Sequence, residues 1–215
     1  MIDAVVFDLD GVLLDSEQLW DEAREQLAQE RGGRWHENAQ RDMMGMSSLE
    51  WSRYMHEAIG LPEPPEEINR EVVDRMAWLY RQRLPVVPGA REATERLAAR
   101  WPLGLASSSN RELIDLALEL MGIAEYFRAT VSSEEVARGK PAPDVYLEAA
   151  RRLEVHPKRA AAVEDSDNGI LAAKAAGMRA IAIPNRHFPP REDALARADV
   201  VLQSLPELTP EVVEP

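Results

Sequence analysis

The stretch Ala4-Val5-Val6-Phe7-Asp8-Leu9-Asp10-Gly11-Val12 decides the fold. Its first four residues are apolar and rich in β-branched and aromatic side chains, which is typical of a strand buried on both faces of a parallel sheet. The strand is expected to end at the acidic turn 8–11, so that Asp8 and Asp10 follow its carboxyl end. The sequence therefore predicts a central strand that delivers two aspartates to one edge of a sheet.

Similar short apolar runs recur along the chain, and helical patterns separate them. The runs lie at 102–106, 129–131, 160–163, 180–183 and 199–202. Apolar residues at i, i+3 and i+4 predict helices over 90–100, 111–121, 144–153 and 168–176. Gly122 and Gly177 follow two of these helices, where a C-cap glycine belongs. This alternation predicts an α/β fold, a Rossmann-like parallel sheet with helices on both faces.

Residues 17–84 interrupt the alternation, because they contain no clear strand. Helical patterns cover 17–30, 38–43, 48–59 and 66–83, and the segment Pro62-Glu63-Pro64-Pro65 forces a turn. We therefore expect two domains. Residues 1–16 together with 85–215 form the α/β core domain, and residues 17–84 form a small all-helical domain.

Composition and charge exclude several classes of protein. The 215 residues include 38 acidic and 25 basic side chains, for a formal net charge of −13, which argues against nucleic acid or an anionic membrane as a partner. No apolar run approaches the ~18 residues of a membrane span, and Asp3, Asp8 and Asp10 argue against a signal peptide. Without cysteine, no disulfide or thiol chemistry is available. We expect a cytoplasmic monomer that binds a small molecule.

The polar residues that follow the strands gather at one edge of the sheet, where open α/β sheets bind their ligands. In chain order they are Asp8 and Asp10, then Ser107, Ser108, Ser109 and Asn110 at the start of a helix, then Gly139-Lys140-Pro141, and then Glu164 and Asp165. Each group alone has an ordinary explanation as a turn former, a helix cap or a solvated lysine. Those explanations do not account for the two aspartates. Two like charges so close together raise each other's pKa unless a cation lies between them.

This set of residues fits phosphoryl transfer. Oxygen ligands without histidine or thiolate indicate Mg²⁺, which Asp8 and Asp165 would hold. Main-chain N–H groups at the start of the helix after Ser107, together with the serine hydroxyl, would bind phosphate oxygens. Lys140 would add positive charge. A carboxylate that faces phosphorus can act as a covalent nucleophile, and a second carboxylate can act as acid and base.

The same residues carry a family resemblance that covers essentially the whole chain. The run 8–12, the serine at 107, Lys140-Pro141 and Glu164-Asp165-Ser166 resemble, in order, the four signature motifs of the haloacid dehalogenase superfamily. Segments 140–146 and 164–170 are similar to the subgroup that contains β-phosphoglucomutase and small sugar-phosphate phosphatases. Segment 15–21 resembles bacterial hexitol and 2-deoxyhexose 6-phosphate phosphatases. The resemblance makes the helical insert a cap domain.

The resemblance also implies a role for each matching residue. Asp8 would be the nucleophile that forms an aspartyl-phosphate. Asp10 would protonate the leaving alcohol and then activate water, while its main-chain carbonyl binds the metal. Asp165 would be a metal ligand, and Glu164 would bind the metal directly or support its ligands. The residues placed at the phosphate above, Ser107 and Lys140, keep that role. We therefore expect a Mg²⁺-dependent phosphomonoester hydrolase that acts on a small sugar, hexitol or similar metabolite phosphate.

Selectivity for the leaving group must come from the cap, because the four motifs touch only the phosphate. We expect Glu17 to bind substrate hydroxyls, Trp20 to form an apolar wall, and Gly45 to face the leaving group. Ser108 and Asn110 would bind beside the phosphate. The ordinary alternative makes Trp20 a core residue of the first cap helix and Glu17 a first-turn acid favoured by the helix dipole.

Other activities remain as alternatives or are disfavoured. A haloacid dehalogenase lacks the second aspartate of the first motif, here Asp10, and a phosphonoacetaldehyde-type hydrolase needs a cap lysine, which residues 17–84 do not contain. A β-phosphoglucomutase-like phosphosugar mutase stays open, although Trp20 and Met44 stand where such a mutase has a histidine and a lysine. A non-catalytic phosphometabolite-binding module also stays open, and it would usually have lost one of the acidic residues.

Overall fold

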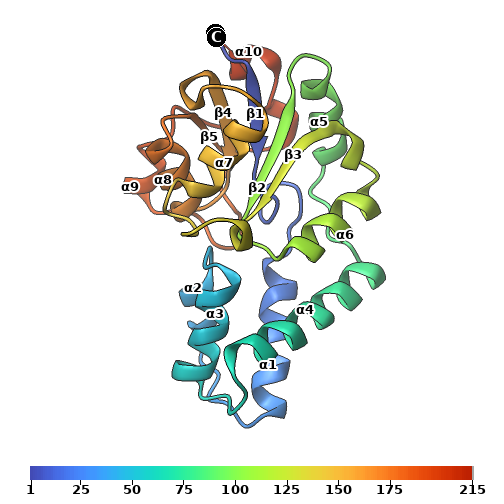
Figure 1. Ribbon diagram of the computed structural model, residues 1–215, viewed down its shortest axis with the longest axis vertical. Helices are drawn as coiled ribbons and strands as arrows, with labels where there is room; N and C mark the ends of the chain where they lie inside the picture. The colour runs from blue at the N-terminus through green and yellow to red at the C-terminus, as the bar shows by residue number, and fades with distance from the viewer. Residues whose placement is uncertain (215) are drawn as a thin grey trace.

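A single parallel sheet with helices on both faces forms the centre of the protein (Figure 1). The computed structural model describes residues 1–214. The strands are β1 (Ala4–Phe7), β2 (Leu103–Ser107), β3 (Phe127–Ser132), β4 (Ala160–Glu164), β5 (Arg179–Ala182) and β6 (Val200–Val201). Their order is β3-β2-β1-β4-β5-β6, and every neighbouring pair is parallel. The predicted α/β, Rossmann-like fold class is confirmed.

The helices of this part of the chain alternate with the strands. They are α5 (Ala90–Ala98), α6 (Arg111–Met121), α7 (Asp144–Arg152), α8 (Asp167–Ala175), α9 (Glu192–Leu195) and α10 (Pro210–Val213). The sequence did not predict α9 and α10, because four residues are too few to show a helical period. Gly122, with a φ of 63°, is the C-cap of α6, as predicted, whereas the C-cap of α8 is Ala176 and Gly177, with a φ of 82°, follows it.

Two apolar layers cover the two faces of the sheet. Val6 and its neighbours on that face pack against the alanine-rich sides of α7 and α8. Val5 and Phe7 point to the opposite layer, which α5 and α6 complete. Because β1 lies between β2 and β4 and is fully buried, the residues that follow it are held at the centre of the sheet edge.

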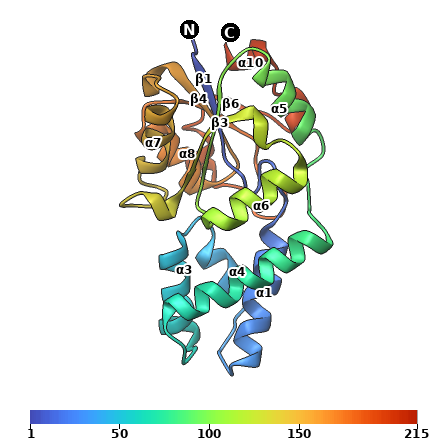
Figure 2. The same cartoon turned by 45° about the vertical axis from the view of Figure 1, so that its right-hand side comes forward.

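Four further helices lie together beyond the carboxyl ends of the strands, at the end of the molecule opposite both termini (Figure 2). They are α1 (Glu17–Glu30), α2 (Ala39–Met43), α3 (Ser48–Tyr54) and α4 (Pro65–Gln82). The expected helix 48–59 is divided, because α3 continues as a π-helical turn, Met55–Ile59, that ends at Gly60. Among residues 1–214, no helix is both long and apolar enough to cross a membrane.

Two chain crossings join these four helices to the sheet, and they are hydrogen-bonded to each other. The Asp15 N–H donates to the Pro85 carbonyl at 2.8 Å, and the Val87 N–H donates to the Leu13 carbonyl at 3.0 Å. The helical unit is therefore tethered by a short paired connection next to the end of β1.

Candidate active site

The carboxyl ends of β1, β2 and β4 form the floor of a pocket that the helices α1 to α3 cover. β1 lies between β2 and β4, so the residues after these strands are neighbours in space although they are far apart in sequence. Asp8 and Asp10 follow β1, Ser107 ends β2, and Glu164 ends β4 and is followed by Asp165. Lys140 reaches the same point from the loop before α7.

A buried cluster of three carboxylates and one ammonium lies at this floor. Asp8, Glu164 and Asp165 offer oxygens within 4.8 Å of one another. The Lys140 Nζ lies 3.0 Å from Asp8 Oδ1 and 2.6 Å from Glu164 Oε1. The Tyr146 hydroxyl donates to the same Glu164 oxygen at 2.6 Å. The cluster therefore combines residues from three separate sequence motifs.

The turn after β1 is shaped to receive Asp165. Gly11 has a φ of +82°, a left-handed conformation that favours glycine. A Cβ atom at position 11 would lie 1.8 Å from Asp165 Oδ2, so no larger residue fits there. The glycine of the first motif thus allows the carboxylate that follows β4 to lie directly against the β1 turn.

Burial and like charges dominate the electrostatics of the cluster. Burial, with further contributions from Glu164 and Asp10, raises the pKa of Asp8 to about 8, although Lys140 opposes the shift. Burial, with further contributions from Glu164, Asp8 and Glu17, raises the pKa of Asp165 well above its ordinary value. Burial lowers the pKa of Lys140, but Asp8 and Glu164 outweigh it and raise that pKa overall. Three carboxylates and one ammonium leave two negative charges when all are ionised, so a divalent cation fits this donor set.

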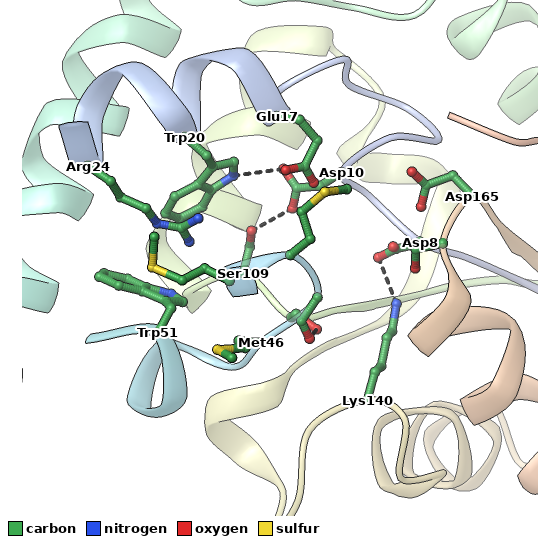
Figure 3. Close-up of a pocket in the computed structure, with 15 residues that line it drawn as sticks. Asp8, Asp10, Glu17, Trp20, Arg24, Met46, Trp51, Ser109, Lys140 and Asp165 are labelled. Atoms are coloured by element: carbon green, nitrogen blue, oxygen red, sulfur yellow. Dashed lines mark hydrogen bonds and ion pairs between the residues drawn. The ribbon is translucent and has the colours of Figure 1, made fainter. Parts of the chain in front are cut away.

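Asp10 points away from this cluster, toward the cap side of the pocket (Figure 3). Its carboxylate accepts hydrogen bonds from the Ser16, Ser107 and Ser109 hydroxyls, the Trp20 indole and the Tyr80 phenol. The Ser109 contact is 2.5 Å long and the Trp20 Nε1 contact is 3.3 Å. Donors from both the sheet edge and the cap therefore fix the orientation of this carboxylate.

The residues after β2 divide between the pocket and its surroundings. Ser108 lines the pocket, and its hydroxyl donates to the Gly45 carbonyl at 3.2 Å, which joins the sheet edge to the cap. Ser107 is fully buried, and its Oγ accepts from the Ser109 N–H at 3.0 Å. The Asn110 amide instead donates to Asn69 and Glu134, so the structure places Asn110 outside the pocket lining.

The cap supplies the opposite wall of the pocket. Glu17, Trp20 and Gly45, which were expected from the sequence to face the leaving group, all line it. Glu17 accepts a hydrogen bond from the Gln40 amide at 2.8 Å. Burial and the nearby Asp10 raise the pKa of Glu17 to about 7. Trp20 is both a buried core residue and a wall of the pocket, so the two interpretations of its role are compatible.

Several residues of the site were given no role from the sequence. Arg24 and Trp51 line the cap wall, Ser109, which the sequence placed only among the polar residues after the second strand, contacts Asp10, and Tyr146 donates a hydrogen bond to Glu164. The helical spacing of 17, 20 and 24 could have pointed to Arg24, because a charged residue at a core-facing position is unusual. Nothing in a single sequence distinguishes Tyr146 from an ordinary core tyrosine.

A family model described as a haloacid dehalogenase-like hydrolase matches residues 2–177. The chain belongs to this family, as the parallel sheet and the carboxylates after β1 and β4 already indicated. The family resemblance stated from the sequence motifs is thereby confirmed.

Relatives and solved structures agree with this assignment. Hexitol phosphatase B from Escherichia coli strain K12 is 35% identical over 210 residues, which cover 96% of this chain and 94% of the relative. A phosphorylated carbohydrates phosphatase from Thermotoga maritima is 35% identical over 182 residues, 84% of each chain. The structure of CbbY from Rhodobacter sphaeroides in complex with xylulose-1,5-bisphosphate superposes with a TM-score of 0.89 and 29% identity over the whole of both chains. The prediction of an enzyme, and of a phosphatase within this family, is confirmed.

Proposed function

We propose that the protein is a Mg²⁺-dependent phosphomonoester hydrolase that acts on a small sugar, hexitol or similar metabolite phosphate through an aspartyl-phosphate. One observation carries the proposal. The carboxylates of Asp8, Glu164 and Asp165 lie within 4.8 Å of one another beside the Lys140 ammonium, on the floor of a pocket whose roof is the cap. In this proposal residues 17–84 act as the cap domain, and residues 1–16 and 85–215 act as the core domain.

Asp8 is the nucleophile in this proposal. Lys140 and the Leu9 N–H both contact its Oδ1, at 3.0 and 2.8 Å, and we assign the attack to Oδ2. A bond forms between this oxygen and phosphorus, and the bond from phosphorus to the leaving oxygen breaks. The Lys140 ammonium faces the negative charge that develops on the phosphoryl oxygens.

Asp10 transfers the protons of both half-reactions. It donates a proton to the leaving oxygen in the first step, and in the second step it removes one from the water that attacks the aspartyl-phosphate. The bond from phosphorus to Asp8 then breaks, which releases phosphate and restores the carboxylate. The hydrogen bonds from Ser109 and Trp20 support this role, because they hold Asp10 at the boundary between the phosphate and leaving-group sides.

The phosphate is assigned to Lys140, Ser107 and Ser108. Ser108 lines the pocket, and the Ser107 hydroxyl, although buried behind the lining, lies 3.5 Å from Oδ2 of Asp10, which lines the pocket. We do not assign a phosphate contact to Asn110, because its amide is directed to Asn69 and Glu134.

The donor set supports Mg²⁺ as the cofactor. The ligands assigned to it are carboxylate oxygens of Asp8 and Asp165 and the main-chain carbonyl of Asp10, with Glu164 as a further ligand or a support for the others. The raised pKa values of Asp8 and Asp165 fit this assignment, because a cation favours the ionised carboxylates that the cluster otherwise disfavours. When bound, Mg²⁺ supplies positive charge that offsets the charge of the phosphate.

The substrate class is inferred from the pocket and from the relatives. The wall opposite the phosphate combines the carboxylate of Glu17 with indole rings and methionine side chains, which suits a polyhydroxylated carbon skeleton. The relatives named as phosphatases of hexitols and phosphorylated carbohydrates support the same class. The assignment of cap residues 17, 20 and 45 to the leaving group follows from this.

A phosphate-release screen tests the proposed function. Purified protein is incubated with hexitol, sugar and glycolate phosphates and with phenyl phosphate, in Mg²⁺ or in excess chelator. We expect release from at least one polyol phosphate and from phenyl phosphate, in Mg²⁺ only. Isomerisation of a sugar phosphate without release of phosphate would identify a mutase instead. Binding of the esters without turnover of any of them would identify a non-catalytic module.

A further inference from the structure

One buried charge in the pocket has no part in the chemistry proposed above. Arg24, on α1, is 4% exposed, and its guanidinium lies 4.6 Å from the ring centroid of Trp20 and 4.8 Å from that of Trp51. Its Nη1 donates to Gln40 Oε1 at 3.1 Å. Its Nε is buried and has no hydrogen-bond partner among residues 1–214. A buried donor without an acceptor disfavours folding. The described residues supply no acceptor for this N–H, so a bound ligand that accepts its hydrogen bond would satisfy it.

Arg24 lies on the side of α1 that faces the pocket, and this location explains why the position carries a charge. Glu17, Trp20 and Arg24 follow one another at spacings of three and four residues, so they share one face of the helix, and all three line the pocket. Trp20 and Leu27, one turn to either side of Arg24, are buried apolar residues. A leucine or methionine at position 24 would fill this face without burying a charge.

Arg24 and Glu17 form the polar part of the cap wall, and Gln40 behind them links the two. Arg24 donates to the oxygen of the Gln40 amide, and the nitrogen of that amide donates to the Glu17 carboxylate. Figure 3 shows Arg24 on the opposite side of the pocket from Asp8, Lys140 and Asp165, with Glu17 between them next to Asp10. A phosphate held at the sheet edge would therefore direct the rest of the substrate toward Arg24.

The charges of this wall select among possible groups on the substrate. One guanidinium and one carboxylate cancel when Glu17 is ionised. A hydroxyl group can accept from the Arg24 Nε–H and also donate to Glu17. A second phosphate or a carboxylate would be attracted by Arg24 but repelled by Glu17 and by Asp10, both of which interact with Arg24. A neutral polyol is therefore the better match.

We propose that Arg24 is a specificity-determining residue that recognises a neutral, polyhydroxylated leaving group through its Nε–H, at the end of the substrate far from the phosphate. This inference rests on the proposed function for the position of the phosphate. The two indole rings hold the guanidinium plane in place, so that the donor is oriented before the substrate binds.

The test compares Arg24→Met and Arg24→Lys with wild type on three probes. Glucitol 6-phosphate carries a neutral polyol, 6-phosphogluconate differs from it by a carboxylate at the far end, and phenyl phosphate has no hydroxyl to recognise. We expect the ratio of kcat/KM for glucitol 6-phosphate to that for phenyl phosphate to fall about tenfold or more in both variants. Arg24→Lys keeps the charge and lacks the Nε–H donor, so it separates the hydrogen bond from the charge. Arg100→Met is the matched control, because Arg100 also lies over an indole, that of Trp101, but outside the pocket.

Three results would overturn the proposal. The first is an equal loss on glucitol 6-phosphate and phenyl phosphate, which would make Arg24 a structural residue. The second is no change in the ratio. The third is a larger loss on 6-phosphogluconate than on glucitol 6-phosphate, which would identify a site for a second anion.

A binding measurement separates this proposal from the proposed function. Calorimetry with glucitol 6-phosphate compares Asp8→Asn with Asp8→Asn/Arg24→Met, neither of which needs to turn over. We expect about tenfold weaker binding by the double variant, whether or not the wild type hydrolyses the ester. Equal affinities in the two variants would contradict a role for Arg24, and absence of turnover by wild type with an affinity difference intact would contradict only the proposed function.

Discussion

Gly169 and Glu164 are so close that no side chain larger than hydrogen fits at position 169. A Cβ atom there would lie 1.8 Å from Glu164 Oε2 and 2.0 Å from Oε1. Glu164 is the fully buried last residue of β4, and Gly169 lies in the first turn of α8. The carboxylate is therefore held against Lys140 and Tyr146 by a helix that leaves room for it.

Gly169→Ala should displace Glu164 and disturb the proposed metal site. Alanine favours a helix over glycine by about 1 kcal/mol, so any loss must come from the clash and not from helix propensity. We expect a higher Mg²⁺ concentration for half-maximal activity and at least about tenfold lower kcat/KM, measured by titration of phosphate release with Mg²⁺. Gly177→Ala is the control. An alanine at this φ of +82° would strain the backbone, but no atom lies closer than 3.5 Å to the added Cβ. It should lower the melting temperature and leave the Mg²⁺ dependence unchanged; the same Mg²⁺ shift in both variants would contradict the role of Gly169.

Asp8→Asn should abolish turnover and leave the fold intact. The amide has nearly the same size but is a far poorer nucleophile, and the substitution removes one of the carboxylates that repel one another in the metal-free cluster. We expect activity below about a hundredth of wild type and a melting temperature in chelator that is equal or higher. Activity above that level, in a variant purified free of wild-type enzyme, would rule out nucleophilic catalysis at this position.

Asp10→Asn should separate substrates by their leaving groups. Phenol leaves readily without a proton, whereas a sugar alcohol needs an acid to protonate its oxygen. In single-turnover experiments we expect phosphoryl transfer from phenyl phosphate to be retained better than transfer from a polyol phosphate. Hydrolysis of the aspartyl-phosphate should slow with both substrates, because the attacking water has lost its base. Equal losses in the transfer step would show that Asp10 is not the acid.

Glu17→Ala should reduce selectivity for polyols. Glu17 lines the cap wall, and an interaction with a buried hydroxyl is worth about 1–3 kcal/mol only when the substrate carries that hydroxyl. We expect kcat/KM for a hexitol phosphate to fall by about tenfold or more and that for phenyl phosphate to fall much less. An equal loss with both esters would assign Glu17 a structural role, and no loss with either would place selectivity elsewhere in the cap.

Glu17 should also make the stability of the protein depend on pH. Its pKa is about 7 in the folded protein and ordinarily 4.5, so the folded state keeps a proton that the unfolded state releases. The resulting stabilisation is fully present below about pH 4.5 and is lost as the pH rises through about 7, by on the order of 1–3 kcal/mol. Denaturant unfolding of wild type and Glu17→Gln between pH 5 and pH 8 measures it. The wild type should lose stability relative to the variant as the pH rises, and parallel curves would contradict the raised pKa.

The sequence predicted the sheet well, and it placed the acidic residues and the lysine at one edge of it, because both features depend on local patterns. Buried parallel strands are short apolar runs, and the residues that follow them must meet at one edge, so the sequence alone places Asp8, Lys140 and Asp165 together. The division of helix 48–59 at Tyr54 could not be predicted, because a π-helical turn has the same apolar pattern as an α-helix.

Contacts between distant segments could not be read from the sequence either. The helix start after Ser107 suggested a phosphate contact for Asn110, but Asn69 from the cap and Glu134 from another loop compete for its amide. The partners of Arg24 come from α2 and α3, which only the folded cap brings next to α1.

The parallel direction of the strands has a practical consequence for handling the protein. Lys140 is buried in the active site, while Lys158 lies just before β4 and Lys174 near the end of α8, both at the edge of the sheet opposite the pocket. Amine-reactive dyes or supports that couple to these two exposed or partly exposed lysines would attach to that far edge. Immobilisation through lysine should therefore orient the molecule with its cap and pocket facing the solution.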